Sequence, residues 1–275
     1  MDREQLDRLM SARDAAQTTL ETAEAELNVI CPKVRIGTVM SVPLCGWNPH
    51  WGCHVSALEP WIREGNMRGE DQIINYGAWW DHGVSNAFED LAERGVDWIL
   101  TMDYDSMFTV EHVSAIFKRL GDNSDIDAVA AMQCRRGSAE TAIIAFDSPQ
   151  EVHVDGSAIP CKSAHFGLTV LRVESLNRVP KPWFLHTPDA DGSYRTYGRV
   201  DPDVHFWNKW AEAGNTLVTE PMIGRTGAIG IGHLQPLVSE FHVVDGKIIA
   251  RHVHFMDWRA RTTRVVDENG EKEAA

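Results

Sequence analysis

Two aspartates stand at the end of an otherwise apolar stretch. The segment over residues 96–108 reads VDWILTMDYDSMF, so Asp103 and Asp105 follow a run suited to a buried strand. Ligand sites in open α/β sheets lie at the carboxyl ends of strands, and residues two apart on a continuous strand face the same side. A divalent cation takes carboxylate oxygens and completes its shell with water or phosphate oxygens. The pair predicts a site for a cation and a diphosphate, and capping of the following turn is the alternative.

A histidine late in the chain is a further candidate. His233 lies in the sequence GIGHLQ, and glycine neighbours let a backbone approach a ligand closely. A histidine of the core or the surface is the alternative interpretation.

Strands and helices alternate along the chain. Apolar, β-branched runs predict strands over residues 34–43, 96–105, 126–134 and 216–224, and helical spacing predicts helices over 83–94, 111–120 and 203–214. The segment over 164–176 reads as a strand that runs into a helix. Thr109 is a plausible N-cap and Gly121 a plausible stop for the second helix. This alternation predicts an α/β sandwich with a mostly parallel central sheet.

The two ends of the chain differ from this body. Residues 1–30 predict a helix whose apolar residues, from Leu6 to Leu27, are spaced by three and four. Such a seam favours a short coiled coil that joins copies of the chain, or a helix docked on its own body. Residues 31–260 form the predicted globular body, and residues 261–275 are charged and predict a flexible tail.

Composition and net charge limit the kinds of binding partner that this chain is expected to have. The 275 residues carry a formal charge of −14, which disfavours broad electrostatic binding to nucleic acid or to an anionic membrane. The sequence holds no apolar run long enough for a membrane span. The five cysteines are widely spaced, and together with the charged N-terminus they favour a cytoplasmic protein with reduced thiols.

The stretch from about Val34 to His233 resembles a nucleotide-sugar glycosyltransferase domain of the GT-A fold, in the compact form found in phages and bacteria. Four blocks carry the resemblance in the family's order: the first strand ending in Pro43, the helix and strand before the D-x-D acids, AHFGLTVLRVESL leading into KPWF, and VDPDVHFWNKWAEAG followed by GHLQ. The fold implied is a Rossmann-like nucleotide-diphospho-sugar transferase sandwich.

The resemblance also implies roles for single residues. Asp103, Asp105 and His233 would hold Mn²⁺ or Mg²⁺ against the donor diphosphate. An inverting transfer needs a base, and Asp203 or Asp201 fits the acidic position at the start of the helix after PWF. Both could instead be ordinary N-caps, since aspartate is favoured there.

The remaining implied contacts concern the donor, a UDP-sugar by preference, and the acceptor. The donor set is Ser41, Val42, Pro43, Asn86, Tyr104 and Arg135 (or its neighbour Arg136), and the acceptor or sugar set is Gly167, Trp183 and Phe184. Core packing is the commoner use of such aromatic residues. The acceptor itself stays open between a glycan, a protein and a modified DNA base.

Three alternatives remain. Cys45, His50, Cys53 and His54 could close a zinc site within one loop. A nucleotidyltransferase would also use paired acids and Mg²⁺, but the segment after the first strand, SVPLCGWNPHW, has no basic residue to grip a triphosphate. A degenerate transferase that acts as an interaction module is the non-catalytic alternative.

Overall fold

The computed structural model describes residues 34–42, 48–76, 80–133, 144–146, 157–194, 200–220, 230–234, 237–244 and 247–254, and only the backbone at 48–53, 76, 144–146, 237–244 and 247–254. The predicted N-terminal helix over 1–30 and the predicted tail over 261–275 lie outside the described residues. Both therefore stay predictions.

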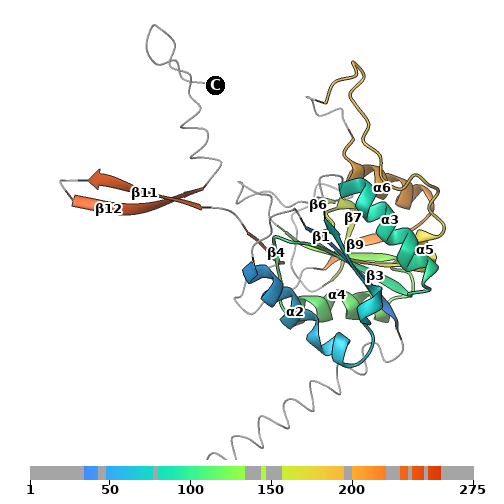
Figure 1. The fold of residues 1–275 in the computed structure, drawn as a ribbon. Coiled ribbons are helices and arrows are strands. Elements are labelled where there is room, and N and C mark those ends of the chain that lie inside the picture. Colours follow the sequence, from blue (N-terminus) through green and yellow to red (C-terminus); the bar gives the residue numbers. More distant parts are fainter. Residues whose placement is uncertain are drawn as a thin grey trace, which may run out of the picture.

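One mixed sheet forms the centre of the molecule (Figure 1). Its strand order is β2 (Gln72–Tyr76), β1 (Ile36–Val42), β3 (Trp98–Asp103), β8 (Leu168–Arg172), β5 (Ala128–Ala131), β9 (Leu217–Glu220), β7 (Ile159–Ala164) and β6 (Ile144–Phe146). Strands β1, β2, β3, β5 and β9 run in one direction, while β8 is antiparallel to both of its neighbours. The predicted α/β sandwich with a mostly parallel sheet is confirmed.

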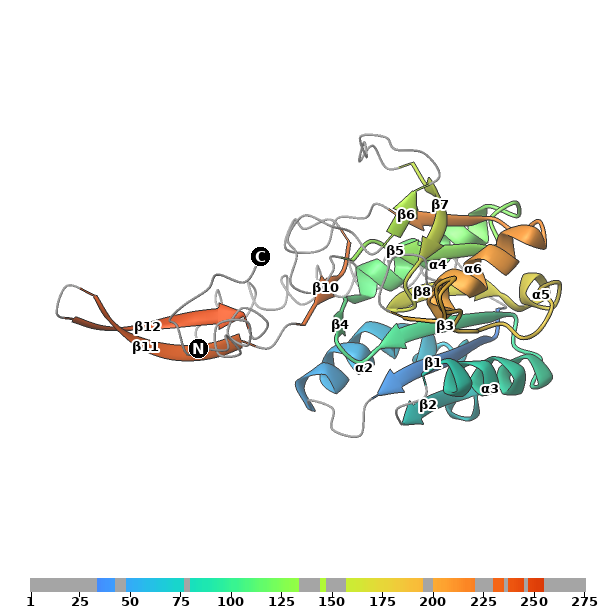
Figure 2. The same cartoon turned by 90° about the horizontal axis from the view of Figure 1, so that it is seen from above.

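Helices cover both faces of this sheet, which Figure 1 shows nearly edge-on and Figure 2 shows from above. One face carries α2 (Asn48–Arg63) and α4 (Val110–Asp122), and the other carries α3 (Trp80–Glu93), α5 (Val173–Leu176) and α6 (Pro202–Glu212). The predicted helices are confirmed with small shifts at their ends. Thr109 is the N-cap of α4, as predicted, but the helix continues past Gly121 to Asp122.

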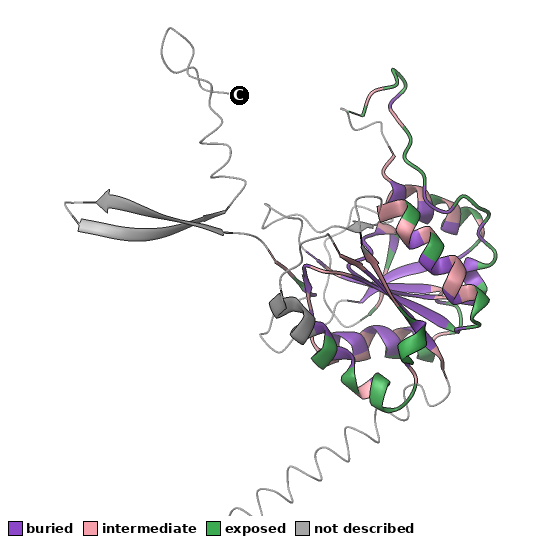
Figure 3. Cartoon of the chain, viewed as in Figure 1, coloured by how far each residue is buried: buried purple, intermediate pink, exposed green. Residues whose placement is uncertain are grey.

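The alternation of side chains along each strand builds a separate core on each face. On β1, Ile36 and Met40 pack on the side of α2 and α4, whereas Val39 packs on the side of α3. This period of two is the signature of a strand covered on both faces. Figure 3 shows the result, a buried sheet between helices whose outer surfaces are exposed.

Helix α2 corrects one expectation. The zinc alternative placed Cys45, His50, Cys53 and His54 in one loop, yet the helix begins at Asn48 and includes Pro60. Its inner side chains explain this outcome: Leu58 and Trp61 are buried, and the Trp61 ring meets the Phe117 ring edge-on at 5.1 Å. Burial against α4 outweighs the weak local propensity, because most helical stability in proteins comes from packing.

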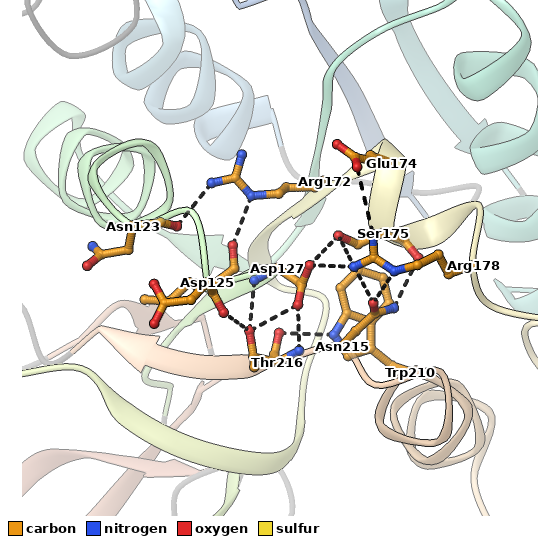
Figure 4. A network of polar contacts seen from close by, with 11 residues as sticks. Asn123, Asp125, Asp127, Arg172, Glu174, Ser175, Arg178, Trp210, Asn215 and Thr216 are labelled. Atoms are coloured by element: carbon orange, nitrogen blue, oxygen red, sulfur yellow. Dashed lines mark hydrogen bonds and ion pairs between the residues drawn. The ribbon is translucent and has the colours of Figure 1, made fainter.

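The amino ends of β5 and β9 are joined by a polar network (Figure 4). The Asp127 carboxylate accepts hydrogen bonds from the Ser175 hydroxyl, the Thr216 backbone amide and the Arg178 guanidinium. Arg178 also donates to Asn215, which bonds in turn to the Ser175 carbonyl. These contacts fix the edge of the sheet that lies opposite Asp103.

Two further two-stranded ladders complete the described structure. Strand β4 (Ser106–Met107) pairs antiparallel with β10 (Gly232–His233), and β11 (Leu237–Val244) pairs with β12 (Lys247–His254) in a hairpin that stands apart from the main sheet in both views (Figures 1 and 2). Within the described ranges, no helix is both long and apolar enough to cross a membrane.

Candidate active site

The acidic pair lies where β3 leaves the sheet. The strand ends at Asp103, Tyr104 and Asp105 form a turn, and β4 begins at Ser106. The two acids are therefore not neighbours on a continuous strand, which corrects the reasoning that placed them on one face. Asp105 is 3% exposed, whereas Asp103 is half-buried.

Backbone hydrogen bonds hold this turn on both sides. The Asp103 amide donates to the Gly167 carbonyl at 3.1 Å, and the Tyr104 amide donates to the Ser41 carbonyl at 3.3 Å. Ser41 is also the register partner of Asp103 between β1 and β3. The ends of β1 and β3 and the start of β8 thus meet at the carboxyl edge of the sheet, where ligand sites of open α/β sheets are found.

His233 reaches the acidic turn from the far end of the chain. In the β4–β10 ladder its register partner is Ser106, the residue after Asp105. Its Nε2 atom lies 3.3 Å from Oδ2 of Asp105, and both side chains are less than a tenth exposed. The Leu234 amide adds a hydrogen bond of 2.8 Å to the Asp105 carbonyl. The structure therefore brings together two of the three predicted metal ligands.

A buried polar layer lies beside this pair. His165 is 6% exposed, its Nδ1 accepts a hydrogen bond from the Gly167 amide, and its Nε2 lies 2.8 Å from the Ala131 carbonyl oxygen. Because Nδ1 accepts, the proton of the neutral ring is on Nε2 and is donated to Ala131. Burial lowers the pKa of His165 to about 4, so the ring is neutral at physiological pH.

Gly167 was expected to let a sugar approach the backbone. The structure gives the glycine a different reason: a Cβ atom at this position would lie 2.6 Å from Nδ1 of His165, 2.6 Å from Oγ of Ser106 and 2.9 Å from Oε1 of Gln133. The protein's own polar atoms occupy the space that a side chain would need.

The predicted base lies at the first turn of α6. Asp201 is the N-cap of this helix, with Pro202 as its first residue, and Asp203 is half-buried in the first turn. Burial raises the pKa of Asp203, and the negative charge of Asp201 adds to this effect while the Val204 amide opposes it. A carboxylate whose charged form is disfavoured in this way is a frequent mark of a functional site.

Aromatic contacts connect the start of α6 with the acidic turn. The Phe206 ring, one helical turn after Asp203, lies 5.3 Å from the ring of Phe166, the neighbour of Gly167. His186 also acts on the charge of Asp203 and lies 3.9 Å from Asp81 in the first turn of α3. The candidate base and the acidic turn are thus built on one continuous set of contacts at this side of the sheet.

Trp183 and Phe184 do not offer a face to a sugar. Their exposed fractions are 5% and 6%, and both rings pack against Phe88. Phe184 is also stacked on Phe206 at 4.9 Å. The structure corrects the expected sugar contact, because these rings are part of the core between α3 and α6.

The structure describes only some of the other residues predicted to bind the donor. Val42 is the last residue of β1, and Asn86 is exposed on α3, where its Nδ2 lies 3.3 Å from Nε2 of His82. Pro43, Arg135 and Arg136 lie outside the described residues.

Of the four residues in the alternative zinc site, the structure describes the side chain of His54. Cys45 and the side chains of His50 and Cys53 lie outside the description. His54 is buried on α2, with Nε2 at 2.8 Å from the Ser106 carbonyl oxygen and its ring stacked on Phe108. It therefore lies beneath β4 rather than in a loop.

The donor chemistry of the acidic turn fits a hard divalent cation only in part. Among the residues that the structure describes, no three His, Cys, Asp or Glu side chains form a preformed metal group. Asp105 and His233 supply an oxygen and a nitrogen within 3.3 Å of each other, and Asp103 lies two residues away. Such a set suits Mn²⁺ or Mg²⁺ if water or phosphate oxygens complete the shell.

Sequence reasoning missed the polar residues around the pair, above all Gln133 and His165. Gln133 is 4% exposed, and its Nε2 donates to Ser106 Oγ at 3.0 Å and to the Gly232 carbonyl at 3.3 Å. It follows the apolar strand β5 just as Asp103 ends β3. The rule that singled out the aspartates, a polar residue at the carboxyl end of a buried strand, would also have found it.

No family model matches the sequence, and none of the curated proteins matches it. Solved structures show a distant likeness in fold. A protein from STIV has 14% identity and a TM-score of 0.45 over 79% of this chain and 95% of that chain. GalNAc-T7, solved with UDP, GalNAc and Mn²⁺, has 10% identity and a TM-score of 0.45 over 73% of this chain and 44% of that chain.

The mannosyltransferase PcManGT from Pyrobaculum calidifontis, solved with GDP-Man and Mn²⁺, has 14% identity and a TM-score of 0.38 over 72% of this chain and 59% of that chain. This chain thus spans less than two thirds of either glycosyltransferase. All three scores lie below 0.5, so this likeness carries no argument about the function of this chain.

Proposed function

We propose that this chain is a metal-dependent glycosyltransferase that takes a sugar from a nucleotide-diphosphate donor, with a UDP-sugar as the preferred class. The observation that carries the proposal is the contact between Asp105 and His233, which are 128 residues apart in sequence and 3.3 Å apart at the carboxyl edge of the sheet. Buried charged side chains are paired or coordinate metals, and such a pair at the carboxyl edge of the sheet is a candidate site.

Asp103, Asp105 and His233 are the residues that would hold Mn²⁺ or Mg²⁺. The cation would neutralise the donor diphosphate and stabilise the charge that develops on the leaving phosphate. The turn over 103–105 is held by the Gly167 and Ser41 carbonyls, so these carboxylates are carried on fixed backbone. A site that is organised before the reaction needs little reorganisation during it.

Asp203 is the better candidate for the base that takes the proton from the acceptor hydroxyl in an inverting transfer. Burial raises its pKa, and a carboxylate made more basic in this way is a stronger proton acceptor once it is ionised. Asp201 remains the second candidate, but its position as the N-cap of α6 gives it a structural role as well.

The donor contacts proposed for Ser41, Val42, Pro43, Tyr104, Asn86 and Arg135 stand as inferences from the family resemblance. Ser41 and Tyr104 have the best structural support, since their backbones are joined beside Asp103. The acceptor, a glycan, a protein or a modified DNA base, remains open, as does assembly of copies through the N-terminal helix.

The proposal is tested by titrating the full chain calorimetrically with UDP, with and without Mn²⁺, and by following sugar release from UDP-sugars. We expect Mn²⁺ to strengthen UDP binding, and Asp105→Asn to reduce Mn²⁺-dependent turnover on the order of 100-fold. Asp90→Asn is the matched control, because Asp90 is an exposed partner of Arg94 on α3. The proposed metal site would be contradicted if Mn²⁺ did not change the affinity for UDP, or if Asp105→Asn kept full turnover.

Asp203→Asn separates binding from chemistry. We expect this variant to bind UDP and Mn²⁺ as the wild type does but to lose transfer to an acceptor, since the substitution removes a proton acceptor and keeps the side chain's size. Wild-type transfer in Asp203→Asn would exclude this residue as the base and leave Asp201 as the candidate.

A further inference from the structure

The segment over residues 230–234 carries His233 to the acidic turn, and its own strand is very short. Strand β10 has two residues, and within the described part of the chain its ladder partner is the two-residue strand β4. A ladder of this length is not stable by itself. Further contacts must therefore hold the segment in place.

Backbone contacts supply part of this support. The Ile231 amide donates to the Met132 carbonyl at 2.7 Å, and the Leu234 amide donates to the Asp105 carbonyl at 2.8 Å. On the other side, Nε2 of His112 lies 3.0 Å from the Gly230 carbonyl oxygen, which ties the segment to α4. These bonds fix the two ends of the segment but leave its centre, Gly232 and His233, to the ladder.

Gln133 spans that centre. Its amide nitrogen has two N–H groups, and it donates to Oγ of Ser106 in β4 and to the carbonyl of Gly232 in β10. Ser106 follows Asp105, and Gly232 precedes His233. One side-chain amide therefore joins the two strands at the residues next to the pair.

The amide of Gln133 is itself held in one place. Its Oε1 lies 2.9 Å from the position of a Cβ on Gly167, and the side chain is 4% exposed. The absence of a side chain at Gly167 thus leaves the room that Gln133 needs. A buried amide with both donors used is well suited to fix the geometry of its neighbours.

We propose that Gln133 is a positioning residue of the metal site: it sets the distance between Asp105 and His233 by joining Ser106 to Gly232. This inference rests on the proposed function, because a metal is what the pair would hold. Gln133 acts through its neighbours and is not itself assigned as a ligand.

A positioning role predicts that substitution of Gln133 weakens metal binding, whereas a purely structural role predicts only a lower folding stability. Residues that orient metal ligands typically change metal affinity 10- to 100-fold when they are substituted. Gln133→Met keeps the size of the side chain and removes both donors. Gln133→Leu also removes both amide donors and adds no charge, so it serves if the methionine variant folds poorly.

Thr219→Val is the matched control. Thr219 is fully buried on β9, and its hydroxyl donates one hydrogen bond of 2.9 Å to the Ala130 carbonyl. This substitution also removes a buried hydrogen bond from the carboxyl half of the sheet at nearly constant volume. It should lower the melting temperature without changing the metal affinity.

The experiment measures Mn²⁺ binding to the full chain by electron paramagnetic resonance, with and without UDP, and hydrogen exchange in peptides that cover residues 230–234. We expect both Gln133 variants to weaken Mn²⁺ binding about 10- to 100-fold and to speed exchange in this segment. Thr219→Val should do neither. Rescue of tight binding in Gln133→Asn is not expected, because the shorter amide cannot span both acceptors.

The outcomes separate the two proposals. If the wild type binds Mn²⁺, Asp105→Asn loses it and Gln133→Met keeps it, the positioning role is overturned and the proposed function stands. If the wild type binds no Mn²⁺ with or without UDP, the metal claim of the proposed function fails. Hydrogen exchange then still decides the role of Gln133, since unchanged exchange over 230–234 in its variants would overturn it.

Discussion

At the scale of single residues, Gly167 shows how one residue type can serve different purposes. The family resemblance implied that the missing side chain makes room for a sugar. The structure fills that room with Nδ1 of His165, Oγ of Ser106 and Oε1 of Gln133. These atoms belong to the layer that supports Asp105 and His233. The glycine therefore acts on the candidate site through packing.

This explanation predicts that Gly167→Ala is destabilising. The new methyl group would lie within 2.6–2.9 Å of three buried polar atoms, and overpacking of this kind costs about 1–3 kcal/mol of unfolding free energy. Urea unfolding measures the change. Gly69→Ala is the control, because nothing lies within 4 Å of a Cβ there. A stability of Gly167→Ala equal to that of the wild type would contradict the packing explanation.

At the scale of elements, the regular strands and helices were predictable because their patterns are local. The apolar run before Asp103 and the helical spacing after Thr109 appear in the structure as β3 and α4. Helix α2 was not predictable, because Pro60 and the nearby glycines argue against a helix, whereas burial of Leu58 and Trp61 favours it. Tertiary packing of this kind leaves no short-range signal.

The candidate site was predictable to the same extent. Asp103 and Asp105 were singled out by the end of an apolar run, and His233 by its glycine neighbours and by the family resemblance. Their actual arrangement was not, because β4 and β10 are two residues each and have no periodicity to read. The contact between Asp105 and His233 depends on that ladder and on Gln133, which are long-range features.

The connection between β7 and β8 depends on a neutral histidine. His165 joins the Gly167 amide to the Ala131 carbonyl at the end of β5, and its own carbonyl accepts from the Thr169 hydroxyl. Protonation of Nδ1 would remove the acceptor that the Gly167 amide uses. Burial accounts for most of the lowering of the pKa to about 4 from the ordinary value of 6.5.

Acid should therefore destabilise the fold through His165. Above pH 6.5 the ring is neutral in both states and its contribution is complete. As the pH falls from 6.5 towards 4, the unfolded chain binds the proton first, and about 3 kcal/mol of unfolding free energy is lost. We expect urea unfolding of His165→Gln to vary less over this range. His82→Gln, on an exposed histidine of α3, should keep the wild-type slope, and a wild-type slope in His165→Gln would contradict the assignment.

At the scale of the whole molecule, the two edges of the sheet hold carboxylates whose pKa values are shifted in opposite directions. Burial alone would raise the pKa of Asp127, but hydrogen bonds from Ser175 and Thr216 and the charge of Arg178 outweigh it and lower the pKa. At the first turn of α6, burial raises the pKa of Asp203, and its neighbours do not compensate. The ionised form of Asp127 therefore stabilises the fold at one edge, whereas the ionised form of Asp203 destabilises it at the other.

Replacement of the two carboxylates by amides should therefore change stability in opposite directions at pH 7. Asp127→Asn removes an ionised form that the fold stabilises above the ordinary aspartate pKa, and it should cost about 1–3 kcal/mol of unfolding free energy. Asp203→Asn removes a charge that the fold disfavours once the pH exceeds its raised pKa, and it should add about 0.5–2 kcal/mol. Urea unfolding at pH 7 measures both changes.

The stability gained by Asp203→Asn should depend on pH. At a pH below the pKa of Asp203 in both the folded and the unfolded state, the gain should disappear, because the wild-type carboxyl is then neutral in both states. A loss of stability in both variants at pH 7 would contradict the division between the two edges, whereas a more stable but inactive Asp203→Asn is the combination expected of a base retained for chemistry.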